Sequence, residues 1–135
     1  MVAKELFELI RRSKKVSELT NGIFDISYAS MDKIWRYDGS MKELPTDDEM
    51  AESVSKVNFQ YILLDQNTST VQLKNAGMKI GFGAIGKGYA ANRAKTVMQS
   101  IGIENGVVNA AGDLLARRKQ ADGTDWRISI IVPNK

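Results

Sequence analysis

The sequence predicts an α+β fold, a layered domain of packed helices and an antiparallel or mixed sheet. Three observations lead to this class. The first residues repeat their apolar side chains with the period of a helix, short strand-like segments are joined by tight turns, and a glycine-rich stretch leads into a second long helical pattern. This mixture favours α+β layers over a repeated β-α-β unit. Because no linker or internal repeat is found, residues 1–135 are expected to form one domain.

Composition excludes several classes of function. The chain has 135 residues, of which 43% are hydrophobic and 26% charged, as in ordinary globular proteins. Its net charge of +3 is too small to indicate a nucleic-acid partner. Cysteine and histidine are both absent, which excludes disulfides, thiolate metal sites and histidine catalysis within this chain. No apolar run approaches the length of a membrane span, and no signal peptide is visible.

The first quarter of the chain is predicted to be mainly helical. Residues 2–19 have the pattern of an amphipathic helix, which Asn21-Gly22 ends. Residues 23–28 alternate briefly between apolar and polar types. Residues 31–37 are expected to form a short helical or irregular stretch.

A helix and a hairpin are predicted next. Thr46 and Glu49 have the spacing of a capping box and predict a helix that ends near Lys56. Residues 61–64 and 71–73 are predicted to be strands, because each is apolar and a polar turn separates them.

The stretch from Met78 to Asn92 organises the rest of the chain. Residues 78–80 are expected to form a short strand, and a helix follows the glycines. Four glycines and one lysine lie between them, namely Gly81, Gly83, Gly86, Lys87 and Gly88. Glycine allows backbone to approach a ligand closely, and the free N–H groups of a helix start attract anions. A phosphate cradle and a simple packing turn are both compatible with these residues.

Two known phosphate motifs fit this stretch incompletely. Gly81, Gly83 and Gly86 spell the dinucleotide pattern G-x-G-x-x-G, which also needs an acidic residue about 20 positions on, after the next strand. Glu104 has the spacing but precedes that strand, and Asp113 lies rather far on. The P-loop pattern fails at its last position, where a glycine replaces the serine or threonine. A Rossmann-type binding module therefore remains an alternative.

The remaining residues predict strands and turns. Residues 107–109 should form a strand, 110–113 a tight corner of small residues, and 114–116 a further extended segment. Asp122-Gly123 is a predicted hairpin turn, and residues 126–132 alternate as a final strand.

An ordered set of short motifs resembles the ApbE family, the FAD:protein FMN transferases once described as thiamine biosynthesis lipoproteins. The family pattern reads approximately T-D-G-x-F-D, L-W, L-P, D-L-G-G-I-A-K-G-Y-A, V-N-x-G-G-D and W-x-I. The matching segments are Thr20 to Asp25, Ile34-Trp35, Leu44-Pro45, Gly86 to Ala90, Val108 to Asp113 and Asp125 to Ile128. No single motif is decisive, but their order and spacing agree along nearly the whole chain.

The resemblance implies a T-fold-like α+β fold and a magnesium-dependent cleavage of FAD. Family members transfer the FMN part to a Thr or Ser hydroxyl of an acceptor flavoprotein and release AMP, and some hydrolyse FAD instead. FAD and an acceptor subunit are thus the expected partners, with no nucleic acid. A periplasmic or cell-envelope location is expected, through a lipid anchor that lies outside this chain.

The resemblance also implies site residues. Ala84 matches the residue whose backbone carbonyl holds magnesium, and Lys87 matches a residue at the FAD site. The corner of Asn21, Gly22 and Ile23 matches another flavin-nucleotide contact. Three residues depart from the family pattern, namely Gly81 in place of the aspartate at an FAD-contacting position, Ala111 in place of the first glycine of G-G-D, and Asn92 in place of an aspartate.

Length separates this chain from the family. It resembles only the central part, which includes Asn109 and Asp113 as expected walls of the site. We expect these residues alone to retain the half of the site that binds the phosphates and to lack activity. The general base is expected elsewhere in the family domain. FAD hydrolysis and an inert folded core remain the alternatives to transfer.

Overall fold

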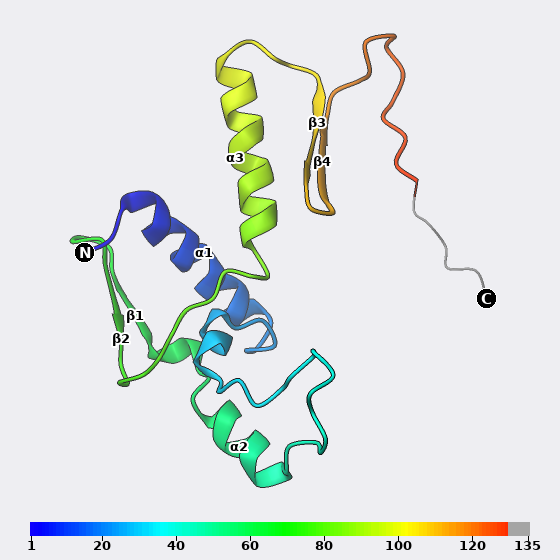
Figure 1. Cartoon of the computed structure of the whole chain (residues 1–135). Helices are drawn as coiled ribbons and strands as arrows, with labels where there is room; N and C mark the ends of the chain where they lie inside the picture. The colour runs from blue at the N-terminus through cyan, green and yellow to red at the C-terminus, as the bar shows by residue number, and fades with distance from the viewer. Residues whose placement is uncertain (130–135) are drawn as a thin grey trace. The chain divides into compact units, whose positions relative to one another are not determined.

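The computed structural model describes residues 1–129. Its elements are α1 (Lys4–Leu19), the 3-10 helix η1 (Ile26–Ser30), α2 (Asp47–Ser55), the 3-10 helix η2 (Phe59–Tyr61), β1 (Ile62–Asp65), β2 (Thr70–Leu73), α3 (Gly86–Ser100), β3 (Gly106–Ala110) and β4 (Asp113–Arg117) (Figure 1). The mixture of helices and small antiparallel sheets confirms the predicted α+β class. The chain divides into two compact units, Met1–Ala84 and Ile85–Lys135. That both belong to one domain stays a prediction.

The first unit holds most of the buried apolar side chains. Phe7 and Ile10 lie on one face of α1 and are each 3% exposed, and Ile26 and Ile62 are buried with them. The spacing of three residues between Phe7 and Ile10 places both on the same side of the helix. Burial of side chains of this size stabilises a fold by about 1.5–3 kcal/mol each. The predicted amphipathic helix is confirmed.

Asn21 and Gly22 end α1 as the sequence predicts. Both adopt left-handed backbone conformations, with φ of 51° and 82°. The Gly22 N–H donates to the Ser17 carbonyl at 2.8 Å, which pairs one of the carbonyls left free at the helix end. The chain then reverses into η1.

The predicted second helix and hairpin are also confirmed. Thr46 Oγ1 accepts from the Glu49 N–H at 3.3 Å, and the Glu49 carboxylate accepts from the Thr46 N–H at 2.8 Å. This reciprocal capping box begins α2. β1 and β2 pair antiparallel, with Ile62 opposite Leu73 and Asp65 opposite Thr70.

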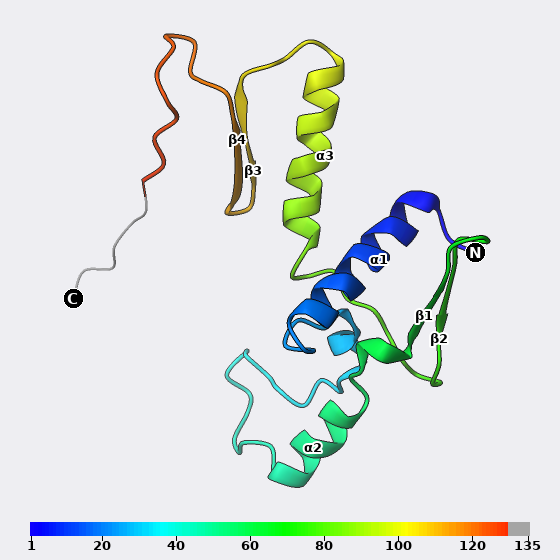
Figure 2. The ribbon, with the colours of Figure 1, turned by 180° about the vertical axis from the view of Figure 1, so that it is seen from behind.

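The second unit is a helix packed beside a hairpin. α3 lies alongside β3 and β4 in both views (Figures 1 and 2). The two strands pair antiparallel, with Val108 opposite Leu115. Ala111 and Gly112 form the tight turn between them, and both have positive φ, of 52° and 102°. Positive φ at both central residues is what a two-residue hairpin of type I′ requires.

Two strand predictions are corrected. Residues 78–80 are not a strand, because the segment finds no partner strand and contacts η1 instead. Within the segment 23–28, which alternates briefly in the sequence, residues 26–28 form part of η1, because the Asp25 side chain accepts from the Ser27 N–H at its start. Residues 126–129 have no ladder partner within the described part, and residues 130–132 of the predicted final strand lie outside it. The turn before them forms, with the Gln120 N–H donating to the Thr124 carbonyl at 2.8 Å, but no strands flank it within the described residues.

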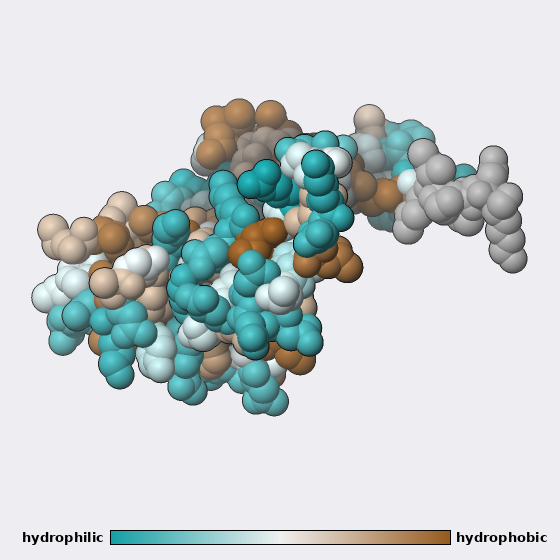
Figure 3. Space-filling view, turned by 60° about the horizontal axis from the view of Figure 1, so that its bottom comes forward, coloured by the Kyte–Doolittle hydropathy of each residue, from teal (hydrophilic) through white to brown (hydrophobic). Residues whose placement is uncertain are grey.

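The surface is largely hydrophilic but carries exposed apolar side chains. Patches of hydrophobic residues appear in brown between the teal polar residues in Figure 3. The most exposed large side chains beyond Met1 include Ile23 and Tyr37, each 92% exposed, and Leu44 at 76%. Among the described residues, no helix is both long and apolar enough to cross a membrane.

Candidate functional site

The corner that follows α1 is held by its own side chains. Thr20 Oγ1 donates to the Val16 carbonyl at 2.9 Å and accepts from the Phe24 N–H at 3.1 Å. The Ile23 N–H donates to the Thr20 carbonyl at 3.1 Å. These bonds fix the backbone at Asn21 and Gly22 and leave the Ile23 side chain in solvent. The three residues predicted to contact the nucleotide are thus brought together, and their FAD contacts stay predictions.

Asp25 connects this corner to the segment before η2. One carboxylate oxygen accepts from the Ser27 N–H and hydroxyl, both at 2.7 Å. The other accepts from the Phe59 N–H at 2.8 Å. The buried Ser27 hydroxyl also accepts from the Asn58 N–H at 2.9 Å. Asp25 is therefore engaged as an acceptor on both oxygens, which indicates a structural role rather than a role as a base.

Residues 79–81 are aligned against η1. The Gly81 N–H donates to the Ile26 carbonyl at 2.8 Å. The Ser30 hydroxyl donates to the Lys79 carbonyl at 3.1 Å and accepts from the Lys79 N–H at 2.9 Å. This short clamp replaces the strand that the sequence predicted and fixes where the glycine stretch begins.

The space beside the glycines is occupied by an aromatic ring. A Cβ atom at Gly81 would lie 2.7 Å from Cζ and Oη of Tyr28, and a Cβ at Gly83 would lie 2.8 Å from the same hydroxyl. Real Cβ atoms essentially never approach another heavy atom so closely, so a side chain at either position would require the Tyr28 ring to move. Sequence reasoning missed Tyr28, since 53 positions separate it from Gly81 and no spacing rule connects them.

Ala84 is an exposed residue at the end of the first unit. Among residues 1–129 its carbonyl accepts no hydrogen bond, and the helical ladder of α3 begins one residue later, at the Ile85 carbonyl. A free carbonyl oxygen fits a hard cation such as Mg²⁺, which takes oxygen ligands only and keeps several from water or phosphate. The described part of the chain contains no cluster of three acidic side chains that could complete such a site. The residues present therefore supply one ligand.

Lys87 lies in the first turn of α3, in the second unit. Its ammonium donates to the Ala111 carbonyl at 3.2 Å. No carboxylate of residues 1–129 lies within ion-pair distance of it, so its positive charge is not neutralised within the described chain. Ile85, the N-cap of α3, provides no side-chain acceptor, which leaves the first N–H groups of the helix open. A lysine and an uncapped helix start are both suited to an anion.

The motif from Val108 to Asp113 forms the β3–β4 turn, and this turn contacts Lys87. Asn109 Oδ1 accepts from the Gly112 N–H at 2.9 Å and holds the turn, while Asp113 begins β4 on the exposed side. The Ala111 carbonyl, which Lys87 contacts, belongs to the same turn. Asn92 donates to the Gly88 carbonyl at 3.1 Å, within α3. Sequence reasoning named Lys87 and this motif separately, and the structure joins them through a main-chain oxygen.

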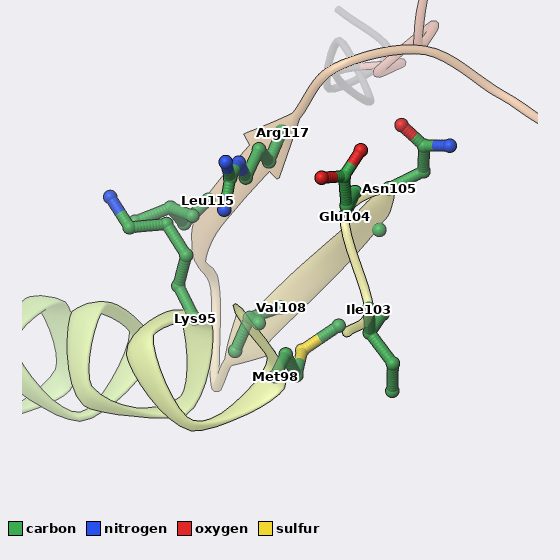
Figure 4. Close-up of a pocket in the computed structure, with 9 residues that line it drawn as sticks. Lys95, Met98, Ile103, Glu104, Asn105, Val108, Leu115 and Arg117 are labelled. Atoms are coloured by element: carbon green, nitrogen blue, oxygen red, sulfur yellow. The ribbon is translucent and has the colours of Figure 1, made fainter. Parts of the chain in front are cut away.

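A small hollow between α3 and the β3–β4 hairpin is the remaining candidate in the second unit. Figure 4 shows the apolar side chains that line it, Met98, Ile103, Val108 and Leu115, with the charged Lys95, Glu104 and Arg117 around them. None of the predicted site residues lines it. Glu104, one of the two acids considered for a ribose contact, pairs with Arg118. Both sheets of the described residues are antiparallel, so the parallel sheet that a Rossmann-type module needs is contradicted.

The curated proteins that are similar to this chain carry the same name. An FAD:protein FMN transferase of Klebsiella pneumoniae is 26% identical over 84% of this chain and 36% of its own length. One of Treponema pallidum is 24% identical over 99% of this chain and 41% of its own length. The chain thus spans about two fifths of the length of these curated relatives.

Solved structures agree in fold. The ApbE protein of Thermotoga maritima matches with a TM-score of 0.72 and 33% identity, over 84% of this chain and 37% of that protein. The flavin transferase ApbE of Vibrio cholerae, as its H257G mutant, matches with a TM-score of 0.84 and 21% identity, over 96% and 42%. A sequence profile of the ApbE family matches residues 1–135. With the motifs at Asp25, Lys87 and Asn109 in place, this match over the whole length shows that the chain belongs to the ApbE family.

Proposed function

We propose that this chain is part of a flavin transferase that moves the FMN moiety of FAD to a Thr or Ser hydroxyl of an acceptor flavoprotein. Family membership and the names of the relatives support the reaction class. One observation carries the proposal. Lys87, at the uncapped start of α3, contacts the Ala111 carbonyl in the β3–β4 turn.

The reaction is a displacement at phosphorus. The acceptor hydroxyl oxygen forms a bond to the FMN phosphorus, the bond from that phosphorus to the bridging oxygen breaks, and AMP leaves with the bridging oxygen. The hydroxyl proton passes to a base. Negative charge on the phosphate oxygens must be offset as the bonds change, and aimed N–H donors and cations do this. Lys87 and the first N–H groups of α3 are suited to that task.

Magnesium is proposed as the cofactor, with the Ala84 carbonyl as one of its ligands. When bound, the ion supplies neutralisation of the pyrophosphate charge. The role of Lys87 is to bind and orient the phosphates, while its bond to the Ala111 carbonyl limits where the ammonium can lie. Asp25 is assigned no proton transfer, because both of its carboxylate oxygens accept hydrogen bonds within the fold.

Thermal unfolding of the chain with FAD tests the proposal, with and without Mg²⁺ and with NAD for comparison. Ligand that binds the native state raises the midpoint by mass action. We expect a shift with FAD that grows with Mg²⁺. Lys87→Ala should weaken FAD binding about tenfold, since a hydrogen bond to a charged group is lost.

Lys95→Ala is the matched control for this substitution. It removes the same charge from the same helix, two turns further on, and should leave FAD binding unchanged. Equal weakening by both variants would show a general effect of net charge and contradict the assignment of Lys87. No shift with FAD would contradict binding by this chain.

A location in the cell envelope through a lipid anchor is also proposed, on the resemblance of the motifs to the family alone. Fractionation of cells that produce the whole protein tests it. Recovery in the soluble cytoplasmic fraction would contradict it.

A further inference from the structure

The ring of Tyr28 lies against Gly81 and Gly83 in the first unit. It lies so close to the glycine stretch that a Cβ atom at Gly81 or Gly83 would force the ring to move. Gly81 is also the position at which this sequence lacks the aspartate of the family pattern. The phenol therefore fills the volume in which a side chain at position 81 would begin.

The ring is held in this place by bonds of the backbone around it. Tyr28 belongs to η1, whose Ile26 carbonyl accepts from the Gly81 N–H at 2.8 Å. Ser30, two residues after Tyr28, forms two hydrogen bonds with the backbone of Lys79. Contacts on both sides of Tyr28 thus fix η1 against residues 79–81.

Tyr28 lies at the surface, and the described part of the fold makes no use of its hydroxyl. The residue is 39% exposed, and among residues 1–129 its hydroxyl has no hydrogen-bond partner. A phenol hydroxyl can donate one hydrogen bond, and a bond to an ionised oxygen is stronger than one to a neutral group. A tyrosine placed only to fill space would need the ring and not the hydroxyl.

We propose that Tyr28 is a substrate-binding residue, whose hydroxyl donates a hydrogen bond to a phosphate oxygen of FAD beside Gly81 and Gly83. The inference rests on the proposed function and names an FAD-contacting residue of the first unit. In this chain the hydrogen bond to the phosphate comes from a side chain of η1, while Gly81 has no side chain and contributes only its backbone.

The first test is FAD binding by Tyr28→Phe in the presence of Mg²⁺, followed by FAD fluorescence. Phenylalanine keeps the ring against the glycines and removes only the hydroxyl. We expect an unchanged unfolding midpoint without ligand and FAD binding weakened about tenfold, as for loss of a hydrogen bond to a charged group. Tyr37→Phe, on a side chain 92% exposed, is the matched control and should bind as the unsubstituted chain does.

The outcomes separate this inference from the function on which it rests. If the unsubstituted chain binds FAD and Tyr28→Phe binds equally well, Tyr28 is a packing residue and the inference is overturned while the function stands. If the unsubstituted chain binds no FAD, both are overturned. Weakening in Tyr28→Phe but not in Tyr37→Phe supports the inference.

A second test addresses the geometry without any ligand. Gly81→Ala should lower the unfolding midpoint, because its Cβ would meet the ring at 2.7 Å. In a Tyr28→Val background the same substitution should cost much less, since the ring is gone, so the two changes should be strongly non-additive. Additive effects would show that the ring does not occupy the space beside Gly81 and would overturn the inference.

Discussion

At the scale of single residues, a carboxylate with three donors supports the corner on which the first predicted contacts lie. Asp25 gathers the Ser27 N–H, the Ser27 hydroxyl and the Phe59 N–H, and Ser27 is fully buried. Replacing one partner in such a group leaves a donor without an acceptor, which costs more than the bond itself contributed. Asp25 belongs to the motif from Thr20 to Asp25, which the sequence predicts to bind the nucleotide, and it also stabilises the fold of the first unit.

Asp25→Asn is expected to lower the free energy of unfolding by about 2 kcal/mol, because the amide nitrogen must face one of these N–H groups. Urea denaturation measures this loss. Asp38→Asn is the matched control, since Asp38 also accepts from the N–H and hydroxyl of the residue two positions on, Ser40, but on the exposed surface. A similar loss in both variants would show that the local turn matters and the bond to Phe59 does not.

At the scale of elements, the start of α2 depends on the ionised form of Glu49. Hydrogen bonds from the backbone N–H and then the side chain of Thr46 hold the pKa of Glu49 below its ordinary value of 4.5. A depressed pKa in the folded state means that the ionised form stabilises the fold. This contribution is fully present above pH 4.5 and is lost as the pH falls through the lower folded pKa.

Comparison of the chain with Glu49→Gln across pH checks this sign. Above pH 4.5 the unsubstituted chain should be the more stable of the two by thermal unfolding, and the difference should shrink on acidification below that pH. A difference that stays constant with pH would show that the carboxylate charge does not contribute to the cap.

The elements that the sequence predicts correctly are those determined by neighbouring residues. Thr46 with Glu49, and Asn21 with Gly22, act over three to five positions, so their caps and turns can be predicted from the sequence. Residues 78–80 failed as a strand because a strand also needs a partner, which the described chain does not supply.

The candidate site shows the same division. Lys87 and the turn at 110–113 were predictable one by one, from residue types and motif order. Their contact was not, because it runs through the main-chain carbonyl of Ala111, whose side chain has no part in it. The approach of Tyr28 to Gly81 likewise depends on how η1 folds back.

At the scale of the whole molecule, the buried apolar residues are unequally divided. Phe7, Ile10, Ile26 and Ile62 belong to the first unit, while Ala91 is the buried hydrophobic residue of the second within residues 85–129. Two-stranded sheets are marginal without apolar burial, and local opening follows the density of buried contacts. Resistance to opening should therefore differ between the units.

Hydrogen exchange followed by mass spectrometry measures this difference. The β1–β2 hairpin, which contains the fully buried Ile62, should exchange more slowly than the β3–β4 hairpin, where no described residue is buried. The two hairpins are of similar length, so each serves as the other's control. Equal rates would contradict the link between burial and protection.

The bond between Lys87 and the main chain at Ala111 also bears on how this sequence can change over time. A carbonyl oxygen is present whatever residue occupies position 111, so mutation there leaves the lysine its partner as long as the left-handed turn forms. Substitutions at position 111 are limited by the backbone conformation of the turn, whereas a neutral residue at position 87 would remove the positive charge itself. An alanine can therefore stand at a glycine position of the family pattern without loss of the contact.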